Sequence, residues 1–293
     1  MSPSVLRSGL VVAAVVAAGA AGAVGVACGN EGSAGGAGVS SSGSSSSGGS
    51  GSGASTGCAA YPGAGFCDDF ERETDASFAA NWPATPYATN PQFVVPAVIE
   101  SPTAYSPTHV LHTDAELVVD AGSAGQRFSE IGRGLPTVLA TQRVSVGFSV
   151  RVVSFVAAEG GYESGPSPDF QISFNAVRGA GPSCLVQFQG QDATHYWINA
   201  CGVLRDGGYP TASVAFTPGT WQRFVVSASF GPTDAGTGTV TVTADGAVVL
   251  SVPMGEGAAT ATEYGGSLTL GSFGYDQTPS MVLDIDDVVI EQK

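Results

Sequence analysis

The alternation of apolar and polar residues in the last third of the chain, residues 220–291, is the strongest constraint on its fold. Thr and Val alternate from Thr239 to Thr243, which gives a strand one buried face and one polar face. Asp245 and Gly246 follow, and this pair readily adopts the positive φ angles of a tight hairpin turn. A second apolar stretch, 248–252, runs back from the turn. This region therefore predicts antiparallel β structure.

The final segment shows the same alternation. Leu283 and Ile285 lie on one side of the predicted strand, and Asp284 and Asp286 lie on the other. The simplest interpretation of these aspartates is that they are solvent-facing charges, which discourage pairing at a sheet edge.

Strand-like stretches also fill the rest of the folded region, and no long segment has helical periodicity. So many short strands, separated by Gly and Pro, predict an all-β fold in which two sheets form a sandwich or barrel. The predicted strands are 65–71, 92–100, 109–119, 127–135, 143–156, 169–177, 184–189, 194–201, 213–216, 222–230, 238–243, 247–253, 267–273 and 281–292.

The charge balance limits the classes of partner. The formal net charge is −15, and the ten basic residues include a single Lys at the last position. No basic stripe can be assembled from so few cations, which argues against nucleic-acid binding. The acidity instead suits an exported protein that self-repulsion keeps soluble.

The first 27 residues resemble an export signal, in which Arg7 is the lone positive charge before an apolar run, residues 9–27. A retained transmembrane helix is the alternative, because this run approaches the roughly 17–25 residues that span a bilayer. Cys28, after Gly25-Val26-Ala27, resembles the lipobox of bacterial lipoproteins, although that family usually has Leu where Gly25 stands. The resemblance implies cleavage before Cys28 and acylation of this residue; a secreted form without lipid is the alternative.

Residues 29–57 are almost wholly Gly, Ser and Ala, with Glu31 as the only charge. Such a segment cannot bury enough apolar surface to offset its ordering entropy, so it predicts a disordered tether with a span on the order of 30 Å. Residues 28–57 would then hold a single folded domain, residues 58–293, away from the membrane of the bacterial cell envelope.

Four cysteines remain in the predicted domain, and an even number in an exported chain predicts two disulfides with three possible connectivities. We favour pairing between sequence neighbours. Cys58–Cys67 would then staple the entry to the domain, and Cys184–Cys201 would join two adjacent strands.

Three motifs resemble the concanavalin A-like lectin/glucanase superfamily, a jelly-roll sandwich shared with laminin G modules. Residues 66–71 (FCDDFE) are similar to its opening strand. Residues 219–221 (GTW), followed by a β run and residues 244–246 (ADG), are similar to its core, and residues 285–290 (IDDVVI) are similar to its closing strand. The resemblance implies a two-sheet antiparallel jelly roll in which the first and last strands are neighbours. These motifs are structural and identify a fold rather than a function.

Motifs of the enzymes on this fold are missing from the sequence. Family 16 glycoside hydrolases carry a Glu-x-Asp-x-(x)-Glu strand, and the similar string here, 284–287 (DIDD), lacks both glutamates. Alginate lyases carry a Gln-Ile-His strand, but Ser173 follows Gln171 and Ile172 here. His109, His112 and His195 have no metal-ligand spacing. An enzyme is therefore possible but no motif supports it.

A polar face is the better candidate site. In four consecutive predicted strands, apolar residues alternate with hydrogen-bonding and aromatic ones, and neighbouring strands would align the polar sides into one patch. An indole can stack on a sugar ring while amides and guanidinium groups meet its hydroxyls. An ordinary solvated sheet face is the alternative. The predicted ligand-binding residues are Arg143, Arg151, Gln171, Asn175, Gln187, Gln189, His195, Trp197 and Asn199.

A structural Ca²⁺ is the second candidate, since jelly-roll relatives often hold one between acids of the first and last strands. The corresponding residues here are Asp69, Glu71, Asp286 and Asp287. Paired surface carboxylates without a metal are the alternative interpretation. Trp82, Trp221 and Phe224 are predicted core residues.

The leading hypothesis from the sequence is a surface lipoprotein that presents a lectin-like jelly roll and binds a polysaccharide or glycoconjugate. One alternative is a polysaccharide lyase or glycoside hydrolase with an unrecognised active site. The other is an adhesive or structural module that binds protein.

Overall fold

The computed structural model describes residues 57–72, 74–83, 96–114, 126–155, 167–179, 183–192, 194–201, 210–230, 238–254, 261–275 and 281–293. All of them belong to one compact unit, Ser52–Lys293. The predicted export signal, Cys28 and nearly all of the tether lie outside the described residues. None of the helices found in the described ranges has the length and apolar character needed to cross a membrane.

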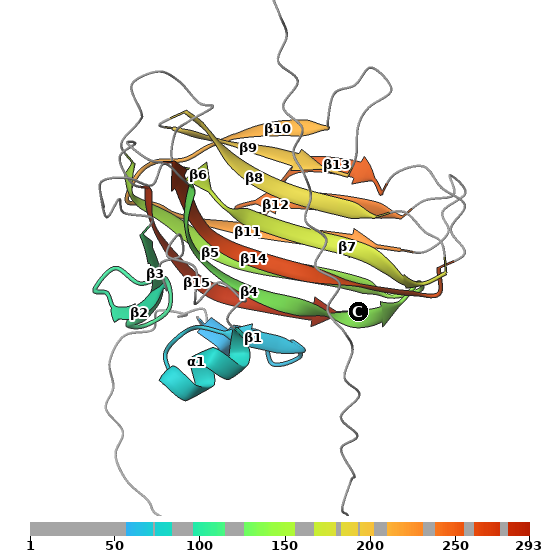
Figure 1. Cartoon of the computed structure of the whole chain (residues 1–293), viewed down its shortest axis with the longest axis horizontal. Helices are drawn as coiled ribbons and strands as arrows, with labels where there is room; N and C mark the ends of the chain where they lie inside the picture. Colours follow the sequence, from blue (N-terminus) through green and yellow to red (C-terminus); the bar gives the residue numbers. More distant parts are fainter. Residues whose placement is uncertain are drawn as a thin grey trace, which may run out of the picture. The chain divides into compact units, whose positions relative to one another are not determined.

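Two antiparallel sheets pack face to face, and Figure 1 shows them as two layers. The sheet that we call the eight-stranded sheet runs in the order β13 (Ala247–Pro253), β12 (Thr239–Ala244), β11 (Trp221–Ser229), β5 (Arg143–Phe155), β15 (Met281–Gln292), β3 (His109–Asp114) and β2 (Ala97–Glu100), with β1 (Phe66–Asp68) also paired to β15. The seven-stranded sheet runs in the order β10 (Thr211–Ala215), β9 (His195–Ala200), β8 (Cys184–Asp192), β7 (Phe170–Arg178), β14 (Glu263–Tyr275) and β4 (Gln126–Leu139), with β6 (Ser167–Pro168) paired to β14. The predicted all-β, two-sheet antiparallel jelly-roll sandwich is confirmed.

Two details of strand pairing also confirm predictions. The first and last strands are neighbours, because Phe66 of β1 pairs with Ile290 of β15. The hairpin between β12 and β13 turns at Asp245 and Gly246, whose φ angles are 49° and 81°. Positive φ at both central residues is the geometry of the primed turns that match strand twist, which explains why this dipeptide stands there.

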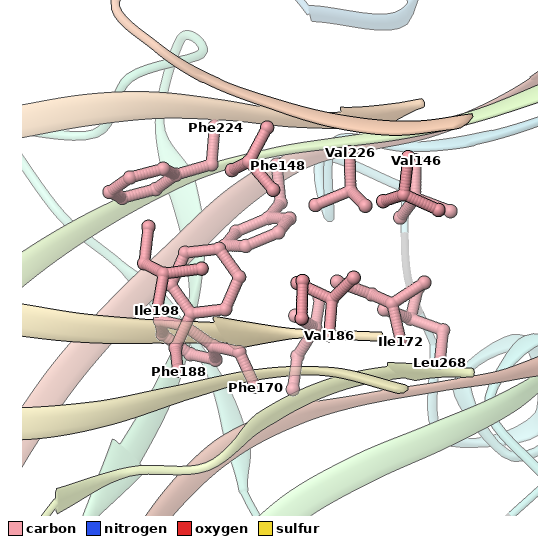
Figure 2. Packing of buried hydrophobic residues seen from close by; sticks show 14 of the residues in the cluster. Val146, Phe148, Phe170, Ile172, Val186, Phe188, Ile198, Phe224, Val226 and Leu268 are labelled. Carbon is pink, nitrogen blue, oxygen red and sulfur yellow. The ribbon is translucent and has the colours of Figure 1, made fainter. Parts of the chain in front are cut away.

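The core lies between the two sheets and consists of the apolar half of each alternating strand. In β5, Val146 and Phe148 are fully buried, and they face Phe170 and Phe188 of the seven-stranded sheet. Figure 2 shows these side chains pointing toward each other from the two sheets. The Phe148 and Phe170 ring centroids are 5.1 Å apart in an edge-on arrangement. Edge-to-face rings pack closely and add to the apolar burial. The predicted inward side of these strands is therefore confirmed.

The chain enters the domain through a 3₁₀ turn (Gly57–Ala60), β1 and a short helix, α1 (Asp75–Asn81). Thr74 caps this helix, because its hydroxyl accepts a hydrogen bond from the backbone N–H of Ser77 and Ser77 Oγ accepts one from the N–H of Thr74. Trp82 directly follows the helix, and its indole N–H donates to Asp68 Oδ2 at 2.7 Å. Trp82 is fully buried in the hydrophobic cluster and is a core residue, as predicted.

Both predicted disulfides form. Cys58 pairs with Cys67, and Cys184 pairs with Cys201. The first joins the 3₁₀ turn to β1, and the second links the start of β8 to the residue just after β9, its neighbour in the sheet.

The interpretation of the β15 aspartates as solvent-facing charges is wrong. Asp284 and Asp286 are buried, because β15 lies inside the sheet between β5 and β3 and the 101–108 segment folds over its outer side. Asp284 Oδ1 lies 2.8 Å from His112 Nδ1, and its Oδ2 forms an ion pair with the Arg151 guanidinium. This contact raises the pKa of His112, because the adjacent carboxylate favours the imidazolium.

Candidate functional site

The outward face of the seven-stranded sheet aligns most of the predicted polar residues. Gln171 of β7 pairs with Gln187 of β8, which pairs with Asn199 of β9. Paired residues in an antiparallel ladder point to the same side, so three side-chain amides stand in one row across three strands. We call this outward side the polar face.

The next row of the polar face contains an aromatic side chain. Gln189 of β8 pairs with Trp197 of β9, and Trp197 is 45% exposed although its neighbours Tyr196 and Ile198 are buried. The alternation along β9 thus turns the indole outward beside the amides. An exposed Trp next to amide groups is a suitable surface for a sugar ring.

Two other predicted residues stand at the margins of this face. Asn175 lies two rows beyond Gln171 along β7, is exposed, and its Nδ2 is 3.4 Å from Ser173 Oγ. His195 begins β9 and lies one row beyond Trp197, with its Nδ1 2.9 Å from Thr194 Oγ1.

The two predicted arginines do not belong to the polar face. Arg143 and Arg151 are on β5, which lies in the other sheet between β11 and β15. Arg143 is exposed, whereas Arg151 is buried and hydrogen-bonds the backbone carbonyl of Thr103 at 3.1 Å in addition to its ion pair with Asp284. The four predicted strands are consecutive in sequence, but the chain changes sheets between β5 and β7, and this separates the arginines from the amides.

A carboxyl pair that no sequence motif indicated completes the polar face. Glu130 of β4 pairs with Gly271 of β14, and the backbone N–H of Asp169 donates to the carbonyl of Gly271 at 2.8 Å from the other side. Glu130 and Asp169 therefore flank one glycine, and their carboxyl groups interact across it. Asp169 Oδ1 also accepts a hydrogen bond from Gln171 Nε2 at 2.6 Å, which ties the pair to the amide row.

This carboxyl pair holds a proton at neutral pH. Burial raises the pKa of Glu130 to about 9, and the charge of Asp169 and the hydrogen bond to it act in the same direction. Asp169 is buried, while Glu130 is partly exposed and is the member that solvent reaches. A carboxyl group that stays protonated near pH 7 can donate a proton, and such shifted groups are characteristic of functional sites.

Neither acid stands in a recognisable motif, which is why sequence reasoning missed the pair. Asp169 extends the polar side of β7 by one residue before buried Phe170, and this was the available signal. Glu130 is distant in sequence, and only the pairing of β14 with both β4 and β7 brings the two carboxyl groups together.

Gly271 keeps the carboxyl pair together, so Gly271→Ala should separate it. A Cβ at this position would overlap the carbonyl of Ser129 and lie 2.5 Å from Glu130 Cα. We expect a loss of about 1–3 kcal/mol in the free energy of unfolding, from overpacking, and a lower pKa of Glu130. Urea unfolding and the infrared band of the protonated carboxyl would measure the two effects. Gly134→Ala is the matched control, since a Cβ there meets nothing within 4 Å; equal effects in both variants would contradict this role.

The four predicted Ca²⁺ ligands do not form a metal site. Glu71 receives its hydrogen bonds from Thr108 and His109, and these bonds lower its pKa to about 2 although burial opposes them. Asp286 receives four, from the N–H groups of residues 105, 106 and 287 and from Ser106 Oγ. A carboxylate offers about four lone-pair positions, so none remains for a cation. In the described ranges, no three His, Cys, Asp or Glu side chains form a group that could hold a metal ion.

The other two predicted Ca²⁺ ligands are Asp69 and Asp287. Asp69 Oδ2 accepts a hydrogen bond from the N–H of Cys58 at 2.9 Å, which fixes the entry to the domain. Asp287 is buried, and burial raises its pKa. Its φ of 48° marks the irregularity at which β15 breaks its register with β5.

The predicted core assignment is wrong for Trp221 and right for Phe224, which is fully buried. Trp221 is half-buried on the outer side of the eight-stranded sheet. Its indole N–H donates to the Thr103 carbonyl at 2.7 Å, and its ring contacts Tyr105 at a centroid distance of 5.8 Å. This residue therefore anchors the 101–108 segment rather than filling the space between the sheets.

Comparisons with known proteins agree with the fold. No protein-family model matches the sequence, and no curated protein matches it. Among solved structures, the chain is similar to an endo-β-1,4-glucuronan lyase from the fungus Trichoderma reesei, with a TM-score of 0.50 and 14% identity over 78% of this chain and 95% of that chain.

Two further similar structures are alginate lyases. One has a TM-score of 0.47 and 14% identity over 75% of this chain and 91% of that chain. The other, from a Chlorella virus, has a TM-score of 0.43 and 8% identity over 74% of this chain and 96% of that chain. At such identities the likeness concerns the fold alone, and the glucuronan lyase is the structure whose score supports it.

Proposed function

We propose that this protein is a polysaccharide lyase whose active site is the polar face of the seven-stranded sheet. The carboxyl pair of Glu130 and Asp169 carries this proposal, because it places a protonated acid and a carboxylate beside a row of amides and an exposed indole. The fold likeness to a glucuronan lyase supports the same class of reaction.

A lyase cleaves a uronic-acid polymer by β-elimination, and a carboxyl pair can serve both proton transfers. The pair accepts the proton from C5 of the sugar, and the electrons of the C5–H bond form a C4–C5 double bond. The C4–O4 bond breaks with its electron pair, and the leaving O4 takes a proton from the pair. The pair thus ends with one proton, as it began, and no water is consumed.

The closeness of the two carboxyl groups favours a lyase over a glycoside hydrolase. Hydrolases keep their two carboxyl groups about 5–5.5 Å apart when a covalent intermediate forms, and about 6.5–9.5 Å apart when water attacks directly. Glu130 and Asp169 instead flank the same glycine and interact directly, an arrangement that suits proton exchange better than either hydrolase geometry. Elimination requires no nucleophile or water between the groups.

The position of the pair also restricts the sugar. Both protons would be exchanged from one side of the ring, so the C5 hydrogen and O4 must lie on the same side. Uronates of gluco or manno configuration meet this condition, whereas galacto and gulo configurations do not.

The full chain, incubated with polymers of each configuration in free and esterified form, tests the proposed function. A lyase creates a double bond conjugated to the carboxyl group, which absorbs in the ultraviolet, and each cleavage creates one new reducing end. New reducing ends without this absorbance would show a hydrolase. Binding without any cleavage would favour a lectin. Absence of both binding and cleavage would favour an adhesive module.

The pH dependence of the lyase follows from the raised pKa of Glu130. We expect kcat/KM to fall as pH rises through about 9, because the proton donor is then lost. Asp169→Asn removes the carboxylate of the pair and should be inactive, but it also removes the neighbouring charge, so the pKa of Glu130 should fall and the infrared band of its protonated carboxyl should disappear at lower pH. A band that disappears at the same pH in this variant and in the parent would contradict the coupling of Glu130 to Asp169.

A lectin is the second candidate, and the exposure of Trp197 favours it. Trp197→Ala should weaken polysaccharide binding about tenfold, which is about 1.4 kcal/mol, and change the free energy of unfolding by less than about 0.5 kcal/mol. Affinity electrophoresis and urea unfolding would measure the two quantities. The matched control is Val248→Ala, which removes a 64% exposed apolar side chain from the eight-stranded sheet; an equal loss of binding there would count against a site at Trp197.

We also propose that Cys28 carries a lipid and that residues 29–57 tether the domain to the bacterial cell envelope. The apolar run before Cys28 and the Gly/Ser composition after it support this arrangement. Cys28→Ser should release the protein from the membrane fraction of the producing cell, and retention of this variant would argue for a membrane-spanning segment instead.

A further inference from the structure

The polar face carries no described cation, and this limits which uronic-acid polymers it can accept. Strands β8, β9, β10 and β14 have no Lys or Arg in their sequences. Arg178, the last residue of β7, forms an ion pair with Glu263 at 3.3 Å, and Arg133 of β4 lies over the Phe66 ring. The side chains of Arg127 and Arg205 lie outside the described residues.

The charge of this face is negative instead. The carboxyl pair has one proton for two carboxyl groups, and the formal net charge of the whole chain is −15. A polymer with a free carboxylate on each sugar would bring like charges together here, which disfavours binding.

The lack of a described cation affects the elimination step as well as substrate binding. Removal of the C5 proton places negative charge on the neighbouring carboxyl group. A free carboxylate would then hold two charges, and enzymes normally offset such developing charge with cations or a metal. An ester would hold a single charge, which hydrogen-bond donors such as the amides of Gln187 and Asn199 can stabilise.

We propose that the substrate of the polar face is a polysaccharide whose uronic-acid carboxyl groups are esterified and therefore uncharged. This inference rests on the proposed lyase function and specifies its substrate class. The amide row and Trp197 would bind the neutral sugars, and the carboxyl pair would exchange the protons.

Paired polymers test this inference. The full chain is incubated with glucuronan and its methyl ester, and with alginate and its ester, and formation of the double bond is followed. We expect the ester to be cleaved at least about tenfold faster than the free acid, the factor that corresponds to 1.4 kcal/mol. Equal or faster cleavage of the free acid would overturn the inference and leave the lyase intact. Cleavage of neither polymer would overturn both.

A variant and a binding measurement make the test independent of turnover. Gln187→Arg places a cation in the amide row, so it should raise the rate on the free acid relative to the ester. Gln187→Glu is the matched variant of opposite charge and should lower the rate on the free acid relative to the ester. In affinity electrophoresis, Glu130→Gln should bind the ester more tightly than the free acid, and added salt should narrow this difference. If neither Gln187 variant changes the preference for the ester over the free acid, recognition by charge is contradicted.

Discussion

Glu130→Gln should abolish the lyase reaction and at the same time stabilise the protein. Loss of the proton donor should lower kcat by about 10²–10⁴-fold, the usual contribution of general acid–base catalysis. Gln keeps a hydrogen-bond donor for Asp169 and has no proton to lose. We therefore expect the free energy of unfolding at pH 7 to rise by on the order of 2 kcal/mol, measured by urea unfolding.

The pH dependence of this stabilisation distinguishes it from improved packing. The pKa of Glu130 rises from 4.5 in its ordinary state to about 9 in the folded protein. Its contribution to stability is therefore complete below pH 4.5 and is lost as pH rises toward 9, so the advantage of the variant should grow across this interval. Glu291→Gln, which removes a charge at the end of β15, is the control and should show no such growth. An active or destabilised Glu130→Gln protein would refute the assigned role.

Asp284→Ala should give the largest loss of stability. Asp284 and Arg151 have side chains that are 3% and 10% exposed, so the substitution would leave the guanidinium buried without its counter-charge. Removing one partner of a buried ion pair costs about 3–5 kcal/mol. Urea unfolding of the variant and the parent would measure this loss, provided that the two proteins have the same m-value.

A double variant separates the orphaned charge from other effects. Asp284→Ala combined with Arg151→Met should lose less stability than Asp284→Ala alone, because no buried charge is left without a partner. Glu291→Ala changes an acid in the same strand and should alter the free energy of unfolding by less than about 0.5 kcal/mol, since it pairs with a Lys293 side chain that is 67% exposed. A double variant less stable than the single one would contradict the buried-pair explanation.

The 101–108 segment is held over the eight-stranded sheet by residues near Asp284. Arg151 and Trp221 both donate hydrogen bonds to the Thr103 carbonyl, and Asp286 accepts the backbone N–H groups of Tyr105 and Ser106. The outer side of the eight-stranded sheet around Arg151, Trp221 and Asp286 is therefore covered by its own chain, whereas the polar face of the other sheet presents amides and an indole. This difference is the structural reason for placing the active site on the seven-stranded sheet.

Much of the fold was predictable from local patterns. The alternation in β5, β7, β8 and β9 assigned their buried sides correctly, and Asp245-Gly246 located the hairpin, because side-chain period and turn chemistry act within a few residues. The disulfide partners agree with the preference for sequence neighbours, although the sequence left three connectivities open. The burial of Asp284 was not, because alternation specifies which residues share a side but does not specify what covers that side.

The sequence by itself determined the strands, their inward residues and the Gln171, Gln187 and Asn199 amides on one side of them. Only the tertiary structure decided which strands share a sheet, and this removed Arg143 and Arg151 from the polar face and added Glu130. Glu130 and Asp169 are brought together by β14, which comes from near the end of the chain and inserts between β4 and β7. Pairings between residues so distant in sequence depend on how the whole chain packs, and no local pattern records them.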